Sequence, residues 1–428
     1  MANILPFQAL RYNPKKVKPE EVLTQPYDKI THAMQEMYYR RSPYNLVRVI
    51  LGKPEAGDDV HKNVYSRAAG YLKTWREENV LVQDVEPSIY YYSQEFVAPG
   101  ETAKRIRRGF VAAGQLHDYE DRIVFRHEQT LSKPKSDRLN LLRATRTHAG
   151  QIFMLYSDPA RRIEQILRNT RDALLDVTDD YEVRNRLWKI SEPKIIAAVQ
   201  AEMKDKKLII ADGHHRYETA LNYRNERRAA AKVKDPNAAY ERVMMTFVNT
   251  ENEGLVILPT HRVVHGLNNF SLADFLKKLG AEFAVSEIDK ANPLTALAKE
   301  ESGTLLLAVT SDGTYLLRAR KEKIAQRLAK YSGAQWELDV LVLHKVVLED
   351  ALCMTEESIR NQEHISYIRD ASEAVARVRN GEAQMAFLMN PVSIEKMSAV
   401  ALAGEVMPQK STDFYPKLLS GLTLFSVE

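Results

Sequence analysis

The chain has 428 residues, of which 44% are hydrophobic and 28% charged, and its formal net charge is only +4. This composition is ordinary for a globular protein of two or three domains, and the nearly balanced charge makes nucleic acid an unlikely partner. No apolar run is long enough to span a membrane and the first residues lack a secretory pattern, so we expect a cytoplasmic protein without a membrane partner. The single cysteine, Cys353, excludes an internal disulfide and is expected to be buried in a helix. The composition does not indicate an oligomeric state.

The first 125 residues alternate short strands, turns and helices. Residues 4–12 predict a strand, and a turn at 24–28 precedes a helix rich in Met and Tyr. Asp28 follows the rigid Pro26–Tyr27 pair, so it is either the N-cap of that helix or a carboxylate that binds a cation or takes a proton. Further elements are predicted as a strand at 46–51, a helix at 61–78, and a hairpin formed by 88–97 and 107–113.

A polar cluster follows the short apolar run at 123–125, and it contains His127, Glu128 and Thr130. His127 and Glu128 lack the HExxH spacing of zinc proteases, so the cluster predicts no zinc site. Glu128 is a candidate acid or base, and His127 and Thr130 are candidate pocket residues.

The most informative stretch is 208–221, where an apolar run breaks into a polar cluster and then resumes at helical spacing. It predicts a buried strand, a tight turn at Gly213 and a helix, whose first N–H groups lack intrahelical partners and attract anions. Asp212 is a good N-cap, but capping alone does not need so many polar side chains. We therefore predict a phosphate site here, with charge-assisted donors from three side chains: His214, His215 and Arg216.

Polar residues also lie beside a later strand end, where residues 255–258 lead into His261 and Arg262. Ligands of α/β sheets bind beyond the carboxyl ends of strands. We therefore expect the polar strand ends at Asp28, at 127–130 and at 212–216 to line one cavity.

The pattern changes after residue 266. Residues 268–330 predict a helix, a strand and a hairpin across 311–313, which we interpret as an inserted α/β subdomain. Residues 336–354 are strongly helical, and 383–389 predict a strand. The last polar cluster, at 407–417, is bounded by prolines, and three of its residues are predicted to contact phosphate: Lys410, Ser411 and Thr412.

Several strings of the sequence resemble one protein family. ADGHHRYETAL at 211–221 is similar to the hallmark of a bacterial and archaeal family catalogued as domain of unknown function 1015. Other strings extend this resemblance over nearly the whole chain: LPFQALRYNP, QPYDKI, SPYNLVRV, HEQT, SDRLNLL, LPTHRVV, WELDVLVLH and MPQKSTDFYPKLLSGL.

A shorter likeness, carried by DGHHR alone, is to the ParB and sulfiredoxin superfamily, which includes nucleotide-binding partition proteins and free-serine kinases. This resemblance implies that the turn holds nucleotide phosphates and that serine is a candidate phosphoryl acceptor. Sulfiredoxins carry a cysteine at this turn, where the present chain has histidine. The resemblance therefore disfavours sulfiredoxin chemistry.

We predict an α/β fold with a mixed sheet, made of a ParB- or sulfiredoxin-like core (1–267), an inserted subdomain (268–330) and a C-terminal segment that returns to the core (331–428). The predicted function is Mg²⁺-dependent phosphotransfer between a nucleotide, ATP or ADP, and a small metabolite. Asp212 or Asp28 would coordinate Mg²⁺ or act as the base, with Glu128 as the rival. Residues predicted to line the substrate pocket are Tyr27, His127, Thr130, His261 and Arg262.

Two alternatives stay open, namely a nucleotide-gated binding protein without catalysis and a metal-dependent hydrolase. The sequence has no Walker A motif and no GxGxxG after a strand, which argues against P-loop NTPases and Rossmann dehydrogenases.

Overall fold

The computed structural model describes residues 1–128, 132–168, 172–233, 235–288, 294–298 and 303–428. The chain forms two compact units: the first contains residues 1–126, 130–256 and 415–428, and the second contains residues 127–129 and 257–414. Apart from the short stretch 127–129, the chain passes from one unit to the other within β13 (Val256–Leu258) and again within β20 (Asp413–Tyr415). Among the described helices, none has both the length and the apolar composition needed to cross a membrane.

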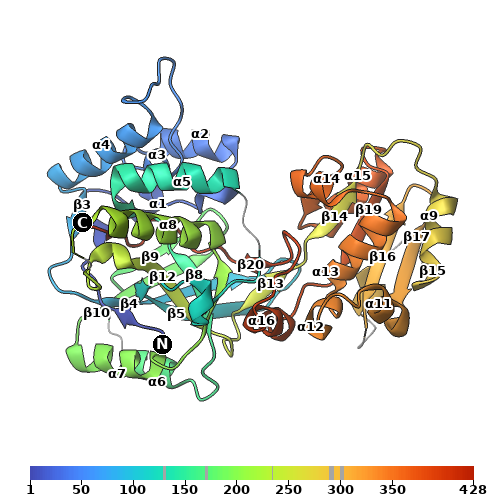
Figure 1. Ribbon diagram of the computed structural model, residues 1–428. Helices are drawn as coiled ribbons and strands as arrows, with labels where there is room; N and C mark the ends of the chain where they lie inside the picture. The colour runs from blue at the N-terminus through green and yellow to red at the C-terminus, as the bar shows by residue number, and fades with distance from the viewer. Residues whose placement is uncertain (129–131, 169–171, 234, 289–293, 299–302) are drawn as a thin grey trace. The chain divides into compact units, whose positions relative to one another are not determined.

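A mixed sheet, with nine strands in the described residues, organises the first unit (Figure 1). β11 is parallel to β6 and antiparallel to β8, and β12 is parallel to β8. Every residue of β12 is buried, as expected of a strand covered on both faces. The predicted α/β class with a mixed sheet is thus confirmed. In sheet order the strands are β6 (Val124–Phe125), β11 (Leu208–Asp212), β8 (Ile152–Tyr156), β12 (Arg242–Asn249), β5 (Lys104–Gln115), β4 (Ile89–Val97), β10 (Arg184–Ile190) and β9 (Leu175–Thr178), with β1 (Ile4–Leu5) paired to β5.

Helices cover both faces of this sheet, with α6 and α7 on the side away from α2, α3, α4 and α5 (Figure 1). α8 follows β11 after one residue and packs against β8, β12 and α5. Two small strand pairs complete the unit, β2 (Leu10–Tyr12) with β3 (Leu81–Gln83) and β7 (Thr147–His148) with β21 (Phe425–Ser426). The helices are α1 (Pro19–Val22), η1 (Tyr27–Lys29), α2 (His32–Arg41), α3 (Val47–Ile50), α4 (Val64–Glu77), η2 (Tyr119–Asp121), α5 (Ser132–Thr145), α6 (Arg162–Leu167), α7 (Pro193–Met203), α8 (His214–Ala230) and η3 (Ala239–Glu241).

The start of α8 is fixed to the sheet by a hydrophobic core that includes Met154 of β8, Met245 of β12 and Tyr217 of α8. Tyr217 is fully buried, and its hydroxyl donates to the carbonyl of His117 at 2.7 Å and accepts the N–H of the same residue at 3.0 Å. Because both roles of the hydroxyl are satisfied, the ring can be buried without a polar penalty. The first turn of α8 therefore has a defined position at the end of β11.

The second unit contains a six-stranded antiparallel sheet among its described residues. It is larger than the subdomain expected at 268–330, because β14, β18 and β19 pair into the same sheet as the strands of that segment. In order the strands are β15 (Phe283–Ile288), β17 (Thr314–Ala319), β16 (Leu305–Thr310), β19 (Met385–Met389), β14 (His261–Val264) and β18 (Ile365–Ile368). The helices are α9 (Leu272–Leu279), α10 (Leu294–Ala298), α11 (Lys321–Arg327), α12 (Gly333–Trp336), α13 (Asp339–Val342), the π-helix η4 (Leu343–Ala351), α14 (Glu356–Asn361), α15 (Ala371–Arg379) and α16 (Ile394–Leu402).

Two local predictions were wrong, and one of the two readings of Asp28 is excluded. The strand expected at 46–51 is the short helix α3, because the side chain of Asn45 accepts the N–H of Val47 at 3.0 Å and turns the chain. Asp28 lies inside η1 and does not cap the following helix, whose N-cap is Thr31. Cys353 is exposed, since it follows the end of η4 with φ of 58°.

Candidate functional site

The turn between β11 and α8 places polar groups at the end of a buried strand. Asp212 is the last residue of β11, and Gly213 occupies the N-cap position of α8 with φ of 95°. This left-handed conformation favours glycine. Asp212 is not the N-cap of α8, because Gly213 occupies that position. Its carboxylate is therefore available for other interactions.

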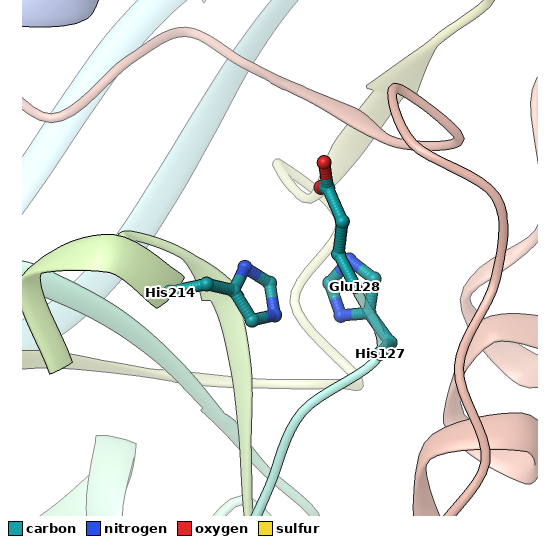
Figure 2. Close-up of side chains that lie close together, drawn as sticks. All are labelled: His127, Glu128 and His214. Atoms are coloured by element: carbon teal, nitrogen blue, oxygen red, sulfur yellow. The ribbon is translucent and has the colours of Figure 1, made fainter. Parts of the chain in front are cut away.

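His214, His215 and Arg216 form the first turn of α8, where backbone N–H groups lack helical partners. Figure 2 shows His214 on this turn, together with His127 and Glu128 on the segment that follows β6. His214 is buried, whereas His215 and Arg216 are half-buried. The N-terminus of this 17-residue helix has the general properties of an anion site.

The guanidinium of Arg216 lies against two glycines. A Cβ at Gly213 would lie 3.0 Å from its Nε and Nη2, and one at Gly150 would lie 3.3 Å from its Nη1. Nη1 donates to the carbonyl of Gln151, and Nη2 lies 3.6 Å from Oδ2 of Asp212. The absence of both side chains therefore creates the space in which Arg216 sits beside the turn.

Asp212 is held among cations. In addition to Arg216, Nζ of Lys417 lies 3.8 Å from its Oδ2. Burial raises the pKa of Asp212, but Lys417, Arg216, Lys29 and His214 together outweigh burial and hold the pKa well below its usual range. The carboxylate is thus ionised and weakly basic, and three permanently charged cations act on it.

Lys417 is positioned by Arg107, a residue that is only 2% exposed. Its Nη1 donates to the carbonyl of Tyr415 at 3.1 Å, its Nη2 donates to the carbonyl of Pro416 at 2.5 Å, and Nη2 also donates to Gln94. Burial lowers the pKa of Arg107 to about 10, so the side chain stays cationic at neutral pH. These bonds fix the segment that carries Lys417 next to Asp212.

Tyr27 and Asp28 belong to the same unit, in the turn η1. Burial raises the pKa of Tyr27, and among the smaller effects Arg216 lowers this pKa and Asp212 raises it, which places the phenol within the electrostatic reach of the β11–α8 turn. The guanidinium carbon of Arg138 lies 4.2 Å from the centre of the Tyr27 ring. Asp28 is exposed.

His127 and Glu128 belong to the second unit, where they contact the last polar cluster. The N–H of Met407 donates to the carbonyl of His127 at 2.8 Å, and ring atom Nε2 of His127 lies 2.8 Å from Oγ1 of Thr412. Ser411 is buried and donates to the carbonyl of Pro408 at 2.5 Å. The hydroxyls of Ser411 and Thr412 thus have protein partners, and the bonds from Met407 and Thr412 hold the cluster against His127.

Two further predicted residues, His261 and Arg262, are buried at the start of β14. Arg262 donates to the carbonyls of Thr260 and Lys410, the latter at 3.2 Å. Burial lowers the pKa of His261 to about 4 and that of Arg262 to about 10. Lys410 itself is exposed, with φ of 57°. These contacts give Arg262 a structural role in holding the 409–410 segment.

Within the first unit, the fold brings together the predicted residues of the β11–α8 turn and Tyr27. The other predicted residues, 127–128, 261–262 and 410–412, belong to the second unit, and Thr130 lies outside the described residues. That three strand ends line one cavity stays a prediction. The sequence did not indicate that Lys29 and Lys417 act on Asp212 or that Arg107 positions Lys417. The position of Lys417 at the end of the last polar cluster was the only signal for any of these three residues.

Comparison with solved structures gives remote similarities. A conserved hypothetical protein from Pyrococcus furiosus is 15% identical at a TM-score of 0.35, over 70% of this chain and 91% of that chain. A free serine kinase in complex with AMP is 14% identical at a TM-score of 0.35, over 70% and 89%. A C-terminally truncated SbnI from Staphylococcus aureus is 12% identical at a TM-score of 0.37, over 73% and 87%.

Comparison with curated proteins gives no match. A family model, described as a protein of unknown function (DUF1015), matches residues 4–341. This span includes the β11–α8 turn and most of the chain, so the protein belongs to the DUF1015 family.

Proposed function

We propose that the chain binds a nucleotide through its phosphates at the β11–α8 turn and transfers a phosphoryl group to a small metabolite. The observation that carries the proposal is the charge at this turn, where Arg216, Lys417 and Lys29 all act on Asp212 at the N-terminus of a long helix. Phosphoryl transfer needs positioning and neutralisation of phosphate charge more than covalent chemistry. Guanidinium, ammonium and backbone N–H groups provide both.

The pKa of Asp212 helps to assign its role. A carboxylate whose pKa is held well below the usual range is a poor general base, because it takes up a proton reluctantly at neutral pH. We therefore assign Asp212 to cation binding or positioning. Exposed Asp28 is then the candidate base in the first unit, and Glu128 remains the alternative from sequence.

The donors at the turn fit Mg²⁺ only together with a nucleotide. Asp212 is a hard oxygen ligand of the kind that Mg²⁺ takes, usually beside substrate phosphates. Two cations lie within 4 Å of this carboxylate and would repel a bare metal ion. When bound, Mg²⁺ would neutralise phosphate charge, while Arg216 and Lys417 hold the remaining phosphate oxygens.

The acceptor is proposed from resemblance alone. The string Asp212–Arg216 resembles that of free-serine kinases, so a hydroxy amino acid is the first acceptor to test. Binding without catalysis is the second candidate, because Asp212 already has ionic partners in Arg216 and Lys417 and the turn could hold phosphate without any reaction.

A thermal-shift panel tests the proposal. ATP, ADP, AMP and pyrophosphate are each added with and without Mg²⁺, beside Mg²⁺ alone and serine alone. A ligand at a hundred times its Kd stabilises the folded state by about 2.7 kcal/mol, which raises Tm by several degrees. We expect Mg²⁺ with ADP or ATP to raise Tm and Mg²⁺ alone to have no effect.

Turnover separates the two candidate functions. We expect consumption of nucleotide, followed by ³¹P NMR, to require a hydroxyl-bearing acceptor. Binding without any turnover over a panel of hydroxy amino acids would favour the binding protein. No shift with any phosphate compound would refute the phosphate site.

A further inference from the structure

A pocket lies beside α8 in the first unit. Its apolar walls come from Val49 and Ile50 of α3 and from Leu141 and Leu142 of α5. Tyr27 and His148 add aromatic residues to the lining, and Arg138 and Arg216 add cationic ones. Largely apolar walls with a few polar groups are typical of small-molecule sites.

One residue that lines this pocket has a buried hydroxyl without a partner. Thr219 is 4% exposed, and its Oγ1 is buried without any hydrogen bond in the described structure. Buried hydroxyls nearly always have a partner, because an unsatisfied one costs about 1–3 kcal/mol. A helical threonine often bonds the carbonyl one turn earlier, but Thr219 does not. A residue that lines the pocket thus has a hydroxyl whose hydrogen-bonding capacity is unused.

The pocket and the β11–α8 turn share Arg216. Arg216 and Thr219 are three residues apart on α8 and so lie on the same face of the helix, where both line the pocket. The same Arg216 lies beside Asp212 and Gly213 at the helix N-terminus. A molecule with an anionic end at the turn and a flat ring in the pocket would contact both residues.

The rings in the pocket favour a heteroaromatic occupant. Stacking of a base on an aromatic side chain contributes about 1–3 kcal/mol and tolerates any base. Tyr27 is half-buried and held by Arg138, 4.2 Å from its ring centre, so little entropy is lost on stacking. Burial lowers the pKa of His148 to about 4, so its ring is neutral at pH 7 and does not repel an uncharged base.

We propose that this pocket binds the base of the nucleotide whose phosphates occupy the β11–α8 turn, with the Thr219 hydroxyl bonded to a ring nitrogen or exocyclic amine. The proposal rests on the proposed function for the phosphate end of the ligand. To the proposed function it adds the position of the base and names Thr219 as the residue that hydrogen-bonds the base.

Calorimetry with three probes tests the pocket in the chain of 428 residues: ADP and pyrophosphate, each with Mg²⁺, and adenosine. We compare the wild type with Thr219→Val, which keeps the shape and removes only the hydroxyl. Ser93→Ala is the matched control, since Ser93 is also buried with an unpartnered hydroxyl but does not line the pocket. Melting curves report the stability of each variant.

We expect the wild type to bind ADP more tightly than pyrophosphate. Thr219→Val should weaken ADP and adenosine about threefold to tenfold, the usual range for one neutral hydrogen bond, and leave pyrophosphate unchanged. Its Tm should not fall, because an unpaired hydroxyl is being removed. Ser93→Ala should bind all three probes as the wild type does.

The outcomes separate this inference from the proposed function. Equal affinity of the wild type for ADP and pyrophosphate, or undiminished ADP binding in Thr219→Val, overturns the base pocket and leaves the phosphate site intact. Adenosine binding that depends on Thr219, without any pyrophosphate binding, supports the pocket and refutes the phosphate site. If Thr219→Val is poorly folded, Tyr27→Leu gives the same comparison from the opposite wall.

Discussion

Asp212→Asn is the substitution that tests the turn most directly, because it removes one charge and changes almost no volume. Nη2 of Arg216 and Nζ of Lys417 lie 3.6 and 3.8 Å from its Oδ2. At an effective dielectric constant of about 20, each pair is worth roughly 4 kcal/mol before desolvation is subtracted. The side chains keep 10–23% exposure and lie beyond hydrogen-bond distance, so the loss should stay below the roughly 3–5 kcal/mol of a fully buried pair.

We therefore expect Asp212→Asn to cost about 2 kcal/mol of unfolding free energy and to lower Tm by roughly 4–8 °C. The same substitution should strengthen, rather than weaken, the binding of a phosphate ligand without Mg²⁺. The lost negative charge no longer repels phosphate, so ADP without Mg²⁺ should bind up to about tenfold more tightly, since 1.4 kcal/mol is one factor of ten. The gain in affinity on adding Mg²⁺ should disappear, and turnover should fall by orders of magnitude.

Calorimetry of ADP with and without Mg²⁺, beside a nucleotide-consumption assay, measures these effects. The matched control is Asp84→Asn, because Asp84 is also buried and ion-paired, with Nη2 of Arg11 at 2.5 Å from Oδ1. This variant should be destabilised yet bind ADP and Mg²⁺ normally. If Asp212→Asn keeps its Mg²⁺ effect and full turnover, the carboxylate is structural and the cation-binding assignment fails.

Two other predictions follow from the same geometry. Arg216→Lys should weaken the binding of ADP and of pyrophosphate about tenfold to a hundredfold and lower Tm only slightly, because an ammonium cannot bond the Gln151 carbonyl and phosphate oxygens at once. Equal affinity of the two proteins by calorimetry would show that Arg216 is a structural residue. His148→Gln should reduce the loss of stability between pH 7 and pH 5. The pKa of His148 is lowered to about 4 by burial, against about 6.5 when unfolded, so the unfolded chain binds the proton first and the wild type loses about 2 kcal/mol over this range. Parallel pH slopes of Tm in the two proteins would contradict this.

The sequence predicted the elements whose signals are local. The strand and helix around Gly213 follow from an apolar run, a residue that tolerates positive φ, and helical spacing of Tyr217, Ala220 and Leu221, and β11 and α8 have nearly those bounds. The alternation of side chains along 88–97 and 107–113 also predicted the hairpin of β4 and β5. The segment 46–51 was misread because four buried residues have no distinguishing period.

The extent of the second unit depends on pairings that no local pattern reveals. β14 and β19 are separated by more than a hundred residues, yet Val263 pairs with Ala386. A strand of four buried residues has the same composition whether it pairs with its sequence neighbour or with a distant strand. The sequence indicated an inserted α/β segment, but only the register shows which flanking strands complete its sheet.

The ionic partners of Asp212 also could not be predicted from local sequence patterns. An acidic residue beside a helix start reads from sequence as a cap, because capping is a local interaction. Lys417 approaches that carboxylate from the far end of the chain, and it does so because buried Arg107 binds the carbonyls of Tyr415 and Pro416. Whether the carboxylate accepts a proton or stays charged therefore depends on residues that only the folded chain brings together. The low pKa that results makes the carboxylate of Asp212 a weak base, so the test of its role measures the effect of Mg²⁺ rather than the pH dependence of turnover.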